Sequence, residues 1–245
     1  MKTIDWPNFS SYKLAGNRAL GGGYYLMEVE NPLPVKSGQF YMMRAWDTEP
    51  LLSRPLSVFD AGGGRTAFVY RVIGRGTAIF AALKPGDSVK LLGALGNGFP
   101  ALDGTAAIVG GGAGCAPLYL AAKQIMSIGA GKVDAYLGFS GEPFLLKEFE
   151  GVANRLTVNT YGLIPDDVEP AAYDYIFSCG PPAMMNALYE KCKAAGKGGS
   201  LYVSMEARMA CGIGTCLVCS CAAAGGRKKV CRDGPVFPAQ EVFGL

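Results

Sequence analysis

Four cysteines near the end of this 245-residue chain constrain its fold more than any other feature. Cys211, Cys216, Cys219 and Cys231 follow the pattern C-x4-C-x2-C-x11-C. The first three have the spacing of plant-type [2Fe–2S] sites, in which four thiolates hold two irons. Glycines between the first two cysteines allow the chain to curl around a cluster. The pattern therefore predicts a small C-terminal [2Fe–2S] segment with these four metal ligands.

The other thiols leave some alternatives open. Cys221 lies two residues after Cys219 and would share its face in an extended segment, so an exchange of ligands stays open. Zinc and unligated thiols are further alternatives. Zinc sites usually have two C-x2-C knuckles, and this segment has one. Cys115, Cys179 and Cys192 are scattered, and buried core thiols are the expectation for them.

The composition excludes several classes of function. The chain has no histidine, which excludes Ser-His-Asp and Cys-His catalysis, His-ligated zinc and Rieske clusters. A net charge of +3 gives no strong field for nucleic acid or anionic lipid. The first ten residues lack the apolar core of a signal peptide. The uncharged stretch 104–122 is nearly long enough for a membrane helix, but it contains five glycines and a proline and therefore favours a strand, a turn and a helix. We expect a cytoplasmic protein with no nucleic-acid or membrane partner, and in that reducing compartment clustered cysteines indicate metal chemistry.

The chain divides into three sections. Residues 1–101 contain short aromatic and apolar segments between glycine and proline turns, which predicts a small β barrel or sandwich. Residues 102–205 alternate strands and helices, which predicts the parallel sheet of an α/β nucleotide-binding domain. Residues 206–245 have no clear period and form the iron–sulfur segment. Strands are expected over 24–29, 40–43, 58–59, 67–73, 88–92, 106–109, 133–139, 156–158, 173–177 and 200–205, and helices over 77–83, from Pro117 onward, over 144–153 and over 182–195.

Two motifs in the β section suit a flavin nucleotide. In Arg54-Pro55-Leu56-Ser57, a guanidinium suits a pyrophosphate and a hydroxyl can hydrogen-bond a flavin ring nitrogen. Gly76 and Thr77 stand at the start of an expected helix, where backbone N–H groups and a hydroxyl would meet phosphate. An ordinary turn with a helix cap is the alternative for the second motif.

Two loops in the α/β section suit a dinucleotide. Residues 110–117, GGGAGCAP, connect a strand to a helix. The G-x-G-x-x-G fingerprint fails because Cys115 takes the place of the last glycine, but the context still suits pyrophosphate at a helix N-terminus. The second loop, Cys179-Gly180-Pro181-Pro182, also ends a strand and opens a helix. Both would lie at the carboxyl edge of one parallel sheet, where ligands bind.

The order of these motifs resembles the ferredoxin-reductase superfamily. The sequences RPLS, GRGT, GGGAGCAP and CGPP are followed by the cysteine pattern, and residues 206–237 resemble most specifically the electron-transfer subunits of class 1B dihydroorotate dehydrogenases. The resemblance covers essentially the whole chain. It implies an FAD-binding barrel, an NAD domain and a [2Fe–2S] segment. It also implies a partner in pyrimidine biosynthesis, an FMN-containing TIM-barrel subunit that oxidises dihydroorotate, in a heterotetramer with two copies of each chain.

The resemblance also assigns residues. Arg54 would hold phosphate and Ser57 the flavin, while Leu56 stands where many relatives place a stacking aromatic ring. The FAD site would be completed by Pro55, Arg71, Val72, Ile73, Gly76 and Thr77, and the NAD site would contain Gly110, Gly111, Gly112, Gly114, Pro117, Cys179, Gly180 and Pro181, with Cys179 near the nicotinamide. Residues 139–142 after the second strand of the α/β section offer no arginine for a 2′-phosphate, so NAD is expected rather than NADP. No catalytic acid or base is required of this chain.

The expected electron route runs from FMN of the partner through the cluster and FAD to NAD⁺, since a flavin converts between single electrons and a hydride. The cluster would lie near the subunit contact, where Lys228, Lys229 and Arg232 aid docking or simply form a solvated basic face.

The alternatives to this function are the same module in a hydrogenase diaphorase or in an NADH-dependent ferredoxin:NADP oxidoreductase. In the latter an Asp often replaces one cysteine ligand. A redox-sensing scaffold without turnover and a zinc-binding module are further alternatives.

Overall fold

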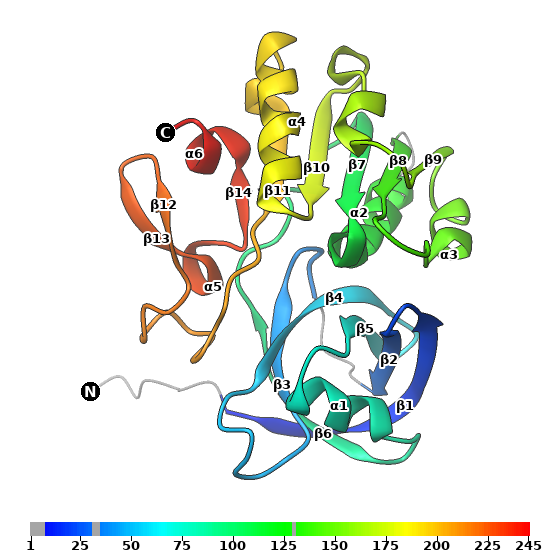
Figure 1. Ribbon diagram of the computed structural model, residues 1–245, viewed down its shortest axis with the longest axis vertical. Helices are drawn as coiled ribbons and strands as arrows, with labels where there is room; N and C mark the ends of the chain where they lie inside the picture. Colours follow the sequence, from blue (N-terminus) through cyan, green and yellow to red (C-terminus); the bar gives the residue numbers. More distant parts are fainter. Residues whose placement is uncertain (1–7, 31–34, 129–130) are drawn as a thin grey trace.

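A closed antiparallel barrel forms the first half of the computed structural model, which describes residues 8–30, 35–128 and 131–245 (Figure 1). Its strands pair in the order β1-β2-β5-β4-β3-β6. Their bounds are Ser10–Gly21 for β1, Tyr24–Glu30 for β2, Phe40–Arg44 for β3, Arg54–Gly62 for β4, Arg65–Arg71 for β5 and Ser88–Leu95 for β6. Helix α1 (Arg75–Ala82) contributes Phe80 to the barrel core. The prediction of a β barrel is confirmed.

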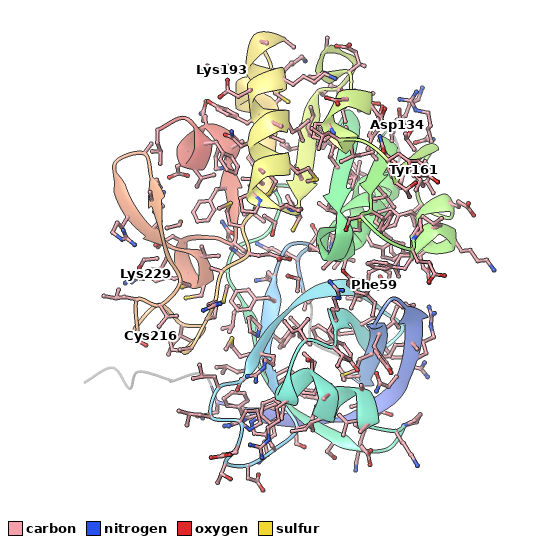
Figure 2. The ribbon with its side chains drawn as sticks, viewed as in Figure 1. Phe59, Asp134, Tyr161, Lys193, Cys216 and Lys229 are labelled. Carbon is pink, nitrogen blue, oxygen red and sulfur yellow. The ribbon has the colours of Figure 1, made fainter. Side chains whose placement is uncertain are left out.

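Alternating side chains give the barrel two buried faces. On β2, Met27 and Val29 pack into the barrel core, whereas Leu26 packs outward with residues of the α/β half. Phe59 of β4 also faces outward, toward the α/β half (Figure 2). Its ring stacks on Tyr119, with centroids 4.4 Å apart. The barrel therefore presents an apolar outer wall to the second half of the molecule.

The second half is a six-stranded sheet in the order β14-β11-β10-β7-β8-β9. Five strands are parallel, namely β7 (Thr105–Gly111), β8 (Lys132–Gly138), β9 (Arg155–Asn159), β10 (Tyr175–Cys179) and β11 (Leu201–Ser204), and β14 (Val236–Pro238) runs antiparallel to β11. Helices α2 (Ala116–Ser127) and α3 (Leu146–Glu150) pack on one face, and α4 (Pro182–Ala194) and α6 (Ala239–Phe243) on the other. Short 3₁₀ helices span Gly112–Cys115, Ile164–Asp167, Pro170–Ala172 and Gly198–Ser200. The predicted α/β nucleotide-binding architecture is confirmed.

The C-terminal section is tied to this sheet. A hairpin of β12 (Ser220–Ala223) and β13 (Gly226–Lys229) leads into α5 (Val230–Asp233), and the chain then enters the sheet as β14. The division into 1–101, 102–205 and 206–245 stays a prediction, and across its second boundary β14 completes a sheet that began with β7.

Most expected elements are present within a few residues, with two differences. The helix expected over 144–153 is confined to Leu146–Glu150, because Leu145 has a φ of 63° and interrupts the helical backbone. The twelve-residue strand β1 and the elements after residue 206 were not expected. In the described part of the chain, no helix has the length and apolar character needed to cross a bilayer.

Candidate functional site

A cavity of about 630 Å³, here called the barrel cavity, lies between the barrel, the start of α2 and residues 205–209. The structure brings many of the expected flavin residues together in its wall. They are Arg54, Pro55, Leu56, Ser57, Arg71, Ile73 and Thr77, joined by Pro117, which was expected in the dinucleotide site. Val72 and Gly76 are not part of this wall.

The barrel cavity combines positive charge with apolar walls. Arg54, Arg71 and Arg208 line it, and Glu206 is the acidic residue in its wall. The Arg54 guanidinium donates to the Leu52 carbonyl oxygen at 2.5 Å. Guanidinium groups pair well with diphosphate, and apolar walls suit a planar ring system, so the cavity fits a flavin dinucleotide.

Gly76 and Thr77 have local roles. A Cβ atom on Gly76 would lie 2.7 Å from Arg54 Nε, so this glycine leaves room for the guanidinium. The Thr77 hydroxyl accepts the N–H groups of Ile73 and Gly74 at 3.0 and 3.2 Å and donates to the Gly74 carbonyl oxygen at 3.0 Å. The hydroxyl is thus used within its own turn, as the helix-cap alternative describes.

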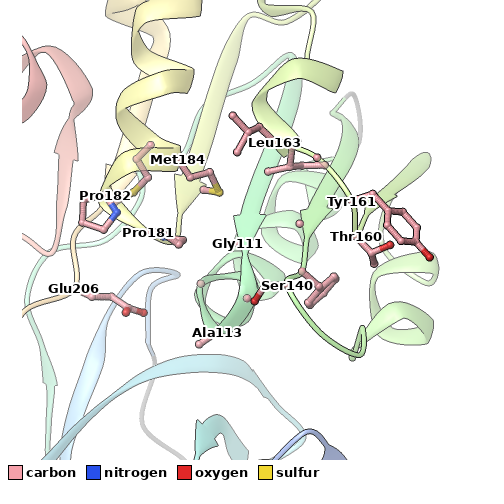
Figure 3. A pocket seen from close by; sticks show the side chains of 18 of the residues that line it. Gly111, Ala113, Ser140, Thr160, Tyr161, Leu163, Pro181, Pro182, Met184 and Glu206 are labelled. Atoms are coloured by element: carbon pink, nitrogen blue, oxygen red, sulfur yellow. The ribbon is translucent and has the colours of Figure 1, made fainter.

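A second cavity of about 830 Å³, here called the sheet cavity, opens at the carboxyl ends of the parallel strands (Figure 3). Its wall contains the expected residues Gly111, Gly112, Gly114, Gly180 and Pro181. Figure 3 shows Glu206 on one side of the glycine turn and Tyr161 on the other. The turn brings chain segments very close, since a Cβ atom on Gly114 would lie 2.3 Å from the Cys179 carbonyl oxygen.

Gly110 and Cys179 lie behind this wall. They pair with each other across β7 and β10, and Cys115 Sγ covers Gly110 so closely that a Cβ atom there would be 2.8 Å away. The Cys179 side chain is fully buried, and burial raises the pKa of its thiol well above the ordinary range. The structure therefore places Cys179 at the expected strand end but in the core rather than in the cavity wall.

The two cavities share part of one wall. Ala113, Met205 and Glu206 line both. The Glu206 carboxylate is exposed at the openings of the two cavities, but the surrounding walls displace water, and this desolvation raises the pKa of the carboxyl group. The sequence analysis did not predict residues 205–209 as cavity residues. They directly follow β11, and the carboxyl end of a parallel strand is the edge of the sheet at which ligands bind.

The four expected thiol ligands lie in the C-terminal section as two neighbouring pairs. Cys219 Sγ and Cys231 Sγ are 3.2 Å apart, and Cys211 contacts Cys216 through its side chain. Burial alone would raise the pKa of Cys211, but hydrogen bonds from Thr215 and from the N–H groups of Cys216 and Ile213 lower it to about 6. Burial and the nearby Cys219 raise the pKa of Cys231 to about 12.

This arrangement fits a two-iron cluster, in which each iron takes two thiolates. In residues 8–30, 35–128 and 131–245, no three cysteine or acidic side chains converge closely enough to hold a single metal ion. Cys221 lies in β12 opposite Lys228, and its thiol interacts electrostatically with Cys219, so the exchange of ligands stays an alternative. Two of the three residues expected to aid docking also have contacts within the chain. Lys228 forms an ion pair with Glu241 of α6, and Arg232 packs against Gly214.

Comparison with known proteins gives the family. Residues 206–243 match the model of the iron–sulfur cluster binding domain of dihydroorotate dehydrogenase B. Electron transfer subunits of dihydroorotate dehydrogenase B (NAD(+)) from Clostridium acetobutylicum and Clostridium perfringens are 40% and 36% identical, each over 94% of this chain and 96% of the relative. The counterpart from Geobacillus kaustophilus is 39% identical over 90% of both chains.

Solved structures share the fold. A structure of an NADH-dependent reduced ferredoxin-NADP oxidoreductase is 25% identical with a TM-score of 0.83, covering 99% of this chain and 91% of that one. A ferredoxin NADP⁺ reductase from Neisseria gonorrhoeae with bound FAD and NADP is 18% identical with a TM-score of 0.63, covering 77% of this chain and 92% of that one. The chain therefore belongs to the family of electron transfer subunits of dihydroorotate dehydrogenase B.

Proposed function

We propose that this chain carries electrons from a dihydroorotate-oxidising, FMN-containing catalytic subunit to NAD⁺ through a [2Fe–2S] cluster and FAD. The observation that carries the proposal is the segment 205–211. Met205 and Glu206 line both cavities, Met209 lines the barrel cavity, and Cys211 is the first cluster thiol. One continuous stretch of chain therefore connects all three expected redox sites.

The barrel cavity is assigned to FAD. Arg54 and Arg71 hold its diphosphate, and Ser57 hydrogen-bonds the ring system. When bound, this flavin exchanges a hydride with the nicotinamide and single electrons with the cluster, which is the conversion that the route requires. The chain's own residues bind and orient the groups, and none of them needs to act as an acid or a base.

The sheet cavity is assigned to NAD. Backbone N–H groups of the glycine turn and the start of α2 supply donors for its diphosphate. Within the described residues, Glu206 is the charged member of the cavity wall, and neither arginine nor lysine lines it. A 2′-phosphate would find no cation there, so oxidation of NADH is expected to be faster than oxidation of NADPH. A clear preference for NADPH in steady-state assays would contradict the assignment.

The segment from Cys211 to Cys219, here called the cluster loop, is assigned to the contact with the catalytic subunit. Cys216 is exposed, as are its apolar neighbours Leu217 and Val218, at 59% and 54% of their surface. Exposed apolar side chains beside a redox group suit a protein contact through which electrons pass. The complex is proposed to be a heterotetramer of two copies of each chain in the cytoplasm. None of the eight cysteines is in a disulfide, which is consistent with a reducing compartment in which thiolates are available to iron.

The test is to purify the tagged chain from its native cells, identify the subunit that co-purifies and measure NAD⁺ reduction by dihydroorotate. An FMN-containing partner with this activity is the expected result. An intact complex that contains FAD and the cluster but does not oxidise dihydroorotate would assign the same module to another electron donor.

A further inference from the structure

Tyr24 belongs to barrel strand β2 but lines the sheet cavity. A methyl group built on Gly112 would lie 3.9 Å from the Tyr24 hydroxyl oxygen. The hydroxyl therefore faces the glycine turn, at which the proposed function places the diphosphate of NAD. The barrel thus contributes a polar group to a site that otherwise belongs to the sheet.

The orientation of the Tyr24 ring is set by two contacts. Its ring stacks on Phe144, with centroids 4.2 Å apart and planes inclined by 26°. Arg71 Cζ lies 5.4 Å from the ring centroid, in cation–π geometry. Phe144 in turn packs edge-on against Phe139, which also lines the sheet cavity, with centroids 5.2 Å apart. These contacts hold the hydroxyl in place before a ligand arrives, which reduces the entropy lost on binding.

The hydroxyl is available to a ligand. Within the described part of the chain, no hydrogen bond engages the Tyr24 hydroxyl. A phenolic hydroxyl is a good donor to an anionic oxygen, and the described wall of the sheet cavity has no arginine or lysine to take that role.

We propose that Tyr24 is a positioning residue for the nicotinamide dinucleotide and that its hydroxyl donates a hydrogen bond to a diphosphate oxygen at the glycine turn. This inference rests on the proposed function, because it takes the sheet cavity as the NAD site. It adds that the site is completed by the barrel and is therefore formed by both halves of the molecule.

Isothermal titration of the oxidised, FAD-loaded complex with NAD⁺ and with ADP-ribose tests the proposal without turnover. Tyr24→Phe keeps the ring contacts and removes the hydroxyl. A hydrogen bond to a charged group contributes about 1.5–3 kcal/mol, so the Kd of NAD⁺ is expected to rise about tenfold or more. ADP-ribose shares the diphosphate and is expected to lose affinity by the same factor.

Tyr25→Phe is the matched control, since Tyr25 stacks on Tyr70 and does not line the sheet cavity. It is expected to leave the Kd of NAD⁺ unchanged. FAD content and the cluster absorbance report whether each variant is intact. A wild-type Kd for Tyr24→Phe, or a loss of affinity for NAD⁺ but not ADP-ribose, overturns the proposal. Failure of the wild-type complex to bind either ligand would instead contradict the proposed function.

Discussion

Arg54 and Gly76 show how a single missing side chain sets the shape of the barrel cavity. A Cβ atom at Gly76 would lie 2.7–2.8 Å from three atoms of the Arg54 guanidinium group. These atoms are at the end of a flexible side chain, which can move without disturbing the backbone. A methyl group at this position should therefore displace the guanidinium but leave the fold intact.

Gly76→Ala is expected to weaken FAD binding about tenfold or more, because loss of one charge-assisted hydrogen bond costs about 1.5–3 kcal/mol. The melting temperature of the protein without FAD should stay near the wild-type value. Gly74→Ala is the matched control, since Gly74 has an extended φ of −177° and a Cβ atom there would meet nothing within 4 Å. Titration of both variants with FAD measures the difference, and equal Kd values would contradict the role of Gly76.

The cysteine pairs give a second prediction for single residues. Serine in place of Cys211, Cys216, Cys219 or Cys231 is expected to abolish the visible absorbance of the cluster, since each pair would lose a thiolate. Cys221→Ser is the control and should keep the spectrum, because the two paired thiol contacts, Cys211 with Cys216 and Cys219 with Cys231, do not include Cys221. Loss of the spectrum in Cys221→Ser would require a different ligand set.

Residues with a distinctive chemical pattern could be predicted from the sequence, and residues positioned by the tertiary fold could not. The four thiols and Arg54 stand in recognisable motifs; the thiols lie as two pairs in the C-terminal section, and Arg54 lines the barrel cavity. Tyr24 and Arg208 are single residues without a motif, and only the packing of barrel against sheet brings them to the cavities. Cys179 has a motif, but the same packing buries its thiol.

Residues 233–236 attach the iron–sulfur section to both halves of the molecule. From the barrel side, Asn97 Nδ2 donates to the Val236 carbonyl oxygen at 2.8 Å, and Asn97 Oδ1 accepts the Val236 N–H at 3.0 Å. From the sheet side, the Met205 N–H donates to the Pro235 carbonyl oxygen at 2.8 Å. Because α5 carries Cys231 directly before this stretch, the anchor also positions one of the proposed cluster ligands.

Asn97→Ala is expected to loosen this anchor. It removes three side-chain hydrogen bonds, two with the Val236 backbone and a longer one to the Asp233 carbonyl oxygen at 3.4 Å. Each is worth about 0.5–1.5 kcal/mol, and their loss leaves backbone groups of Val236 without their partner. The melting temperature should fall by several degrees, and the cluster should be lost faster in the presence of an iron chelator. Asn154→Ala is the control, since Asn154 accepts a hydrogen bond from Val133 N–H far from the cluster section. It should lower the melting temperature without accelerating cluster loss, and equal rates of loss in both variants would contradict the anchor.

Elements were predictable where side-chain type and periodicity agree. The strands β2, β5, β7 and β10 are rich in aromatic and apolar residues, and each was expected. Strand β1 (SSYKLAGNRALG) contains few residues with strand propensity, and its pairing with both β2 and β6 holds it extended. The three residues of β14 are too short to give a periodic pattern, and β11 supplies their partners.

At the scale of the whole molecule, the two cavities and the cluster lie in a fixed order along one segment. The wall shared by the cavities consists of Ala113, Met205 and Glu206 and contains no cluster ligand. The cluster loop instead packs on the barrel, since a Cβ atom on Gly212 would lie 2.5 Å from Met42 Cγ. We therefore expect exchange between NADH and FAD to use different contacts from exchange between FAD and the cluster.

This separation predicts that one substitution divides the activity into two parts. In the complex carrying Cys216→Ser, NADH should still bleach the FAD absorbance at nearly the wild-type rate, because both cavities and their shared wall are unchanged. Dihydroorotate-dependent reduction of NAD⁺ should be lost, since electrons from the partner reach FAD through the cluster. Cys216 is exposed, so its replacement disturbs the core least among the four ligands. Stopped-flow measurement of the first reaction and a steady-state assay of the second distinguish the outcomes.

A wild-type rate of dihydroorotate-dependent NAD⁺ reduction in the Cys216→Ser variant would mean that electrons bypass the cluster. Slow bleaching by NADH would mean that the cluster section also shapes the dinucleotide site.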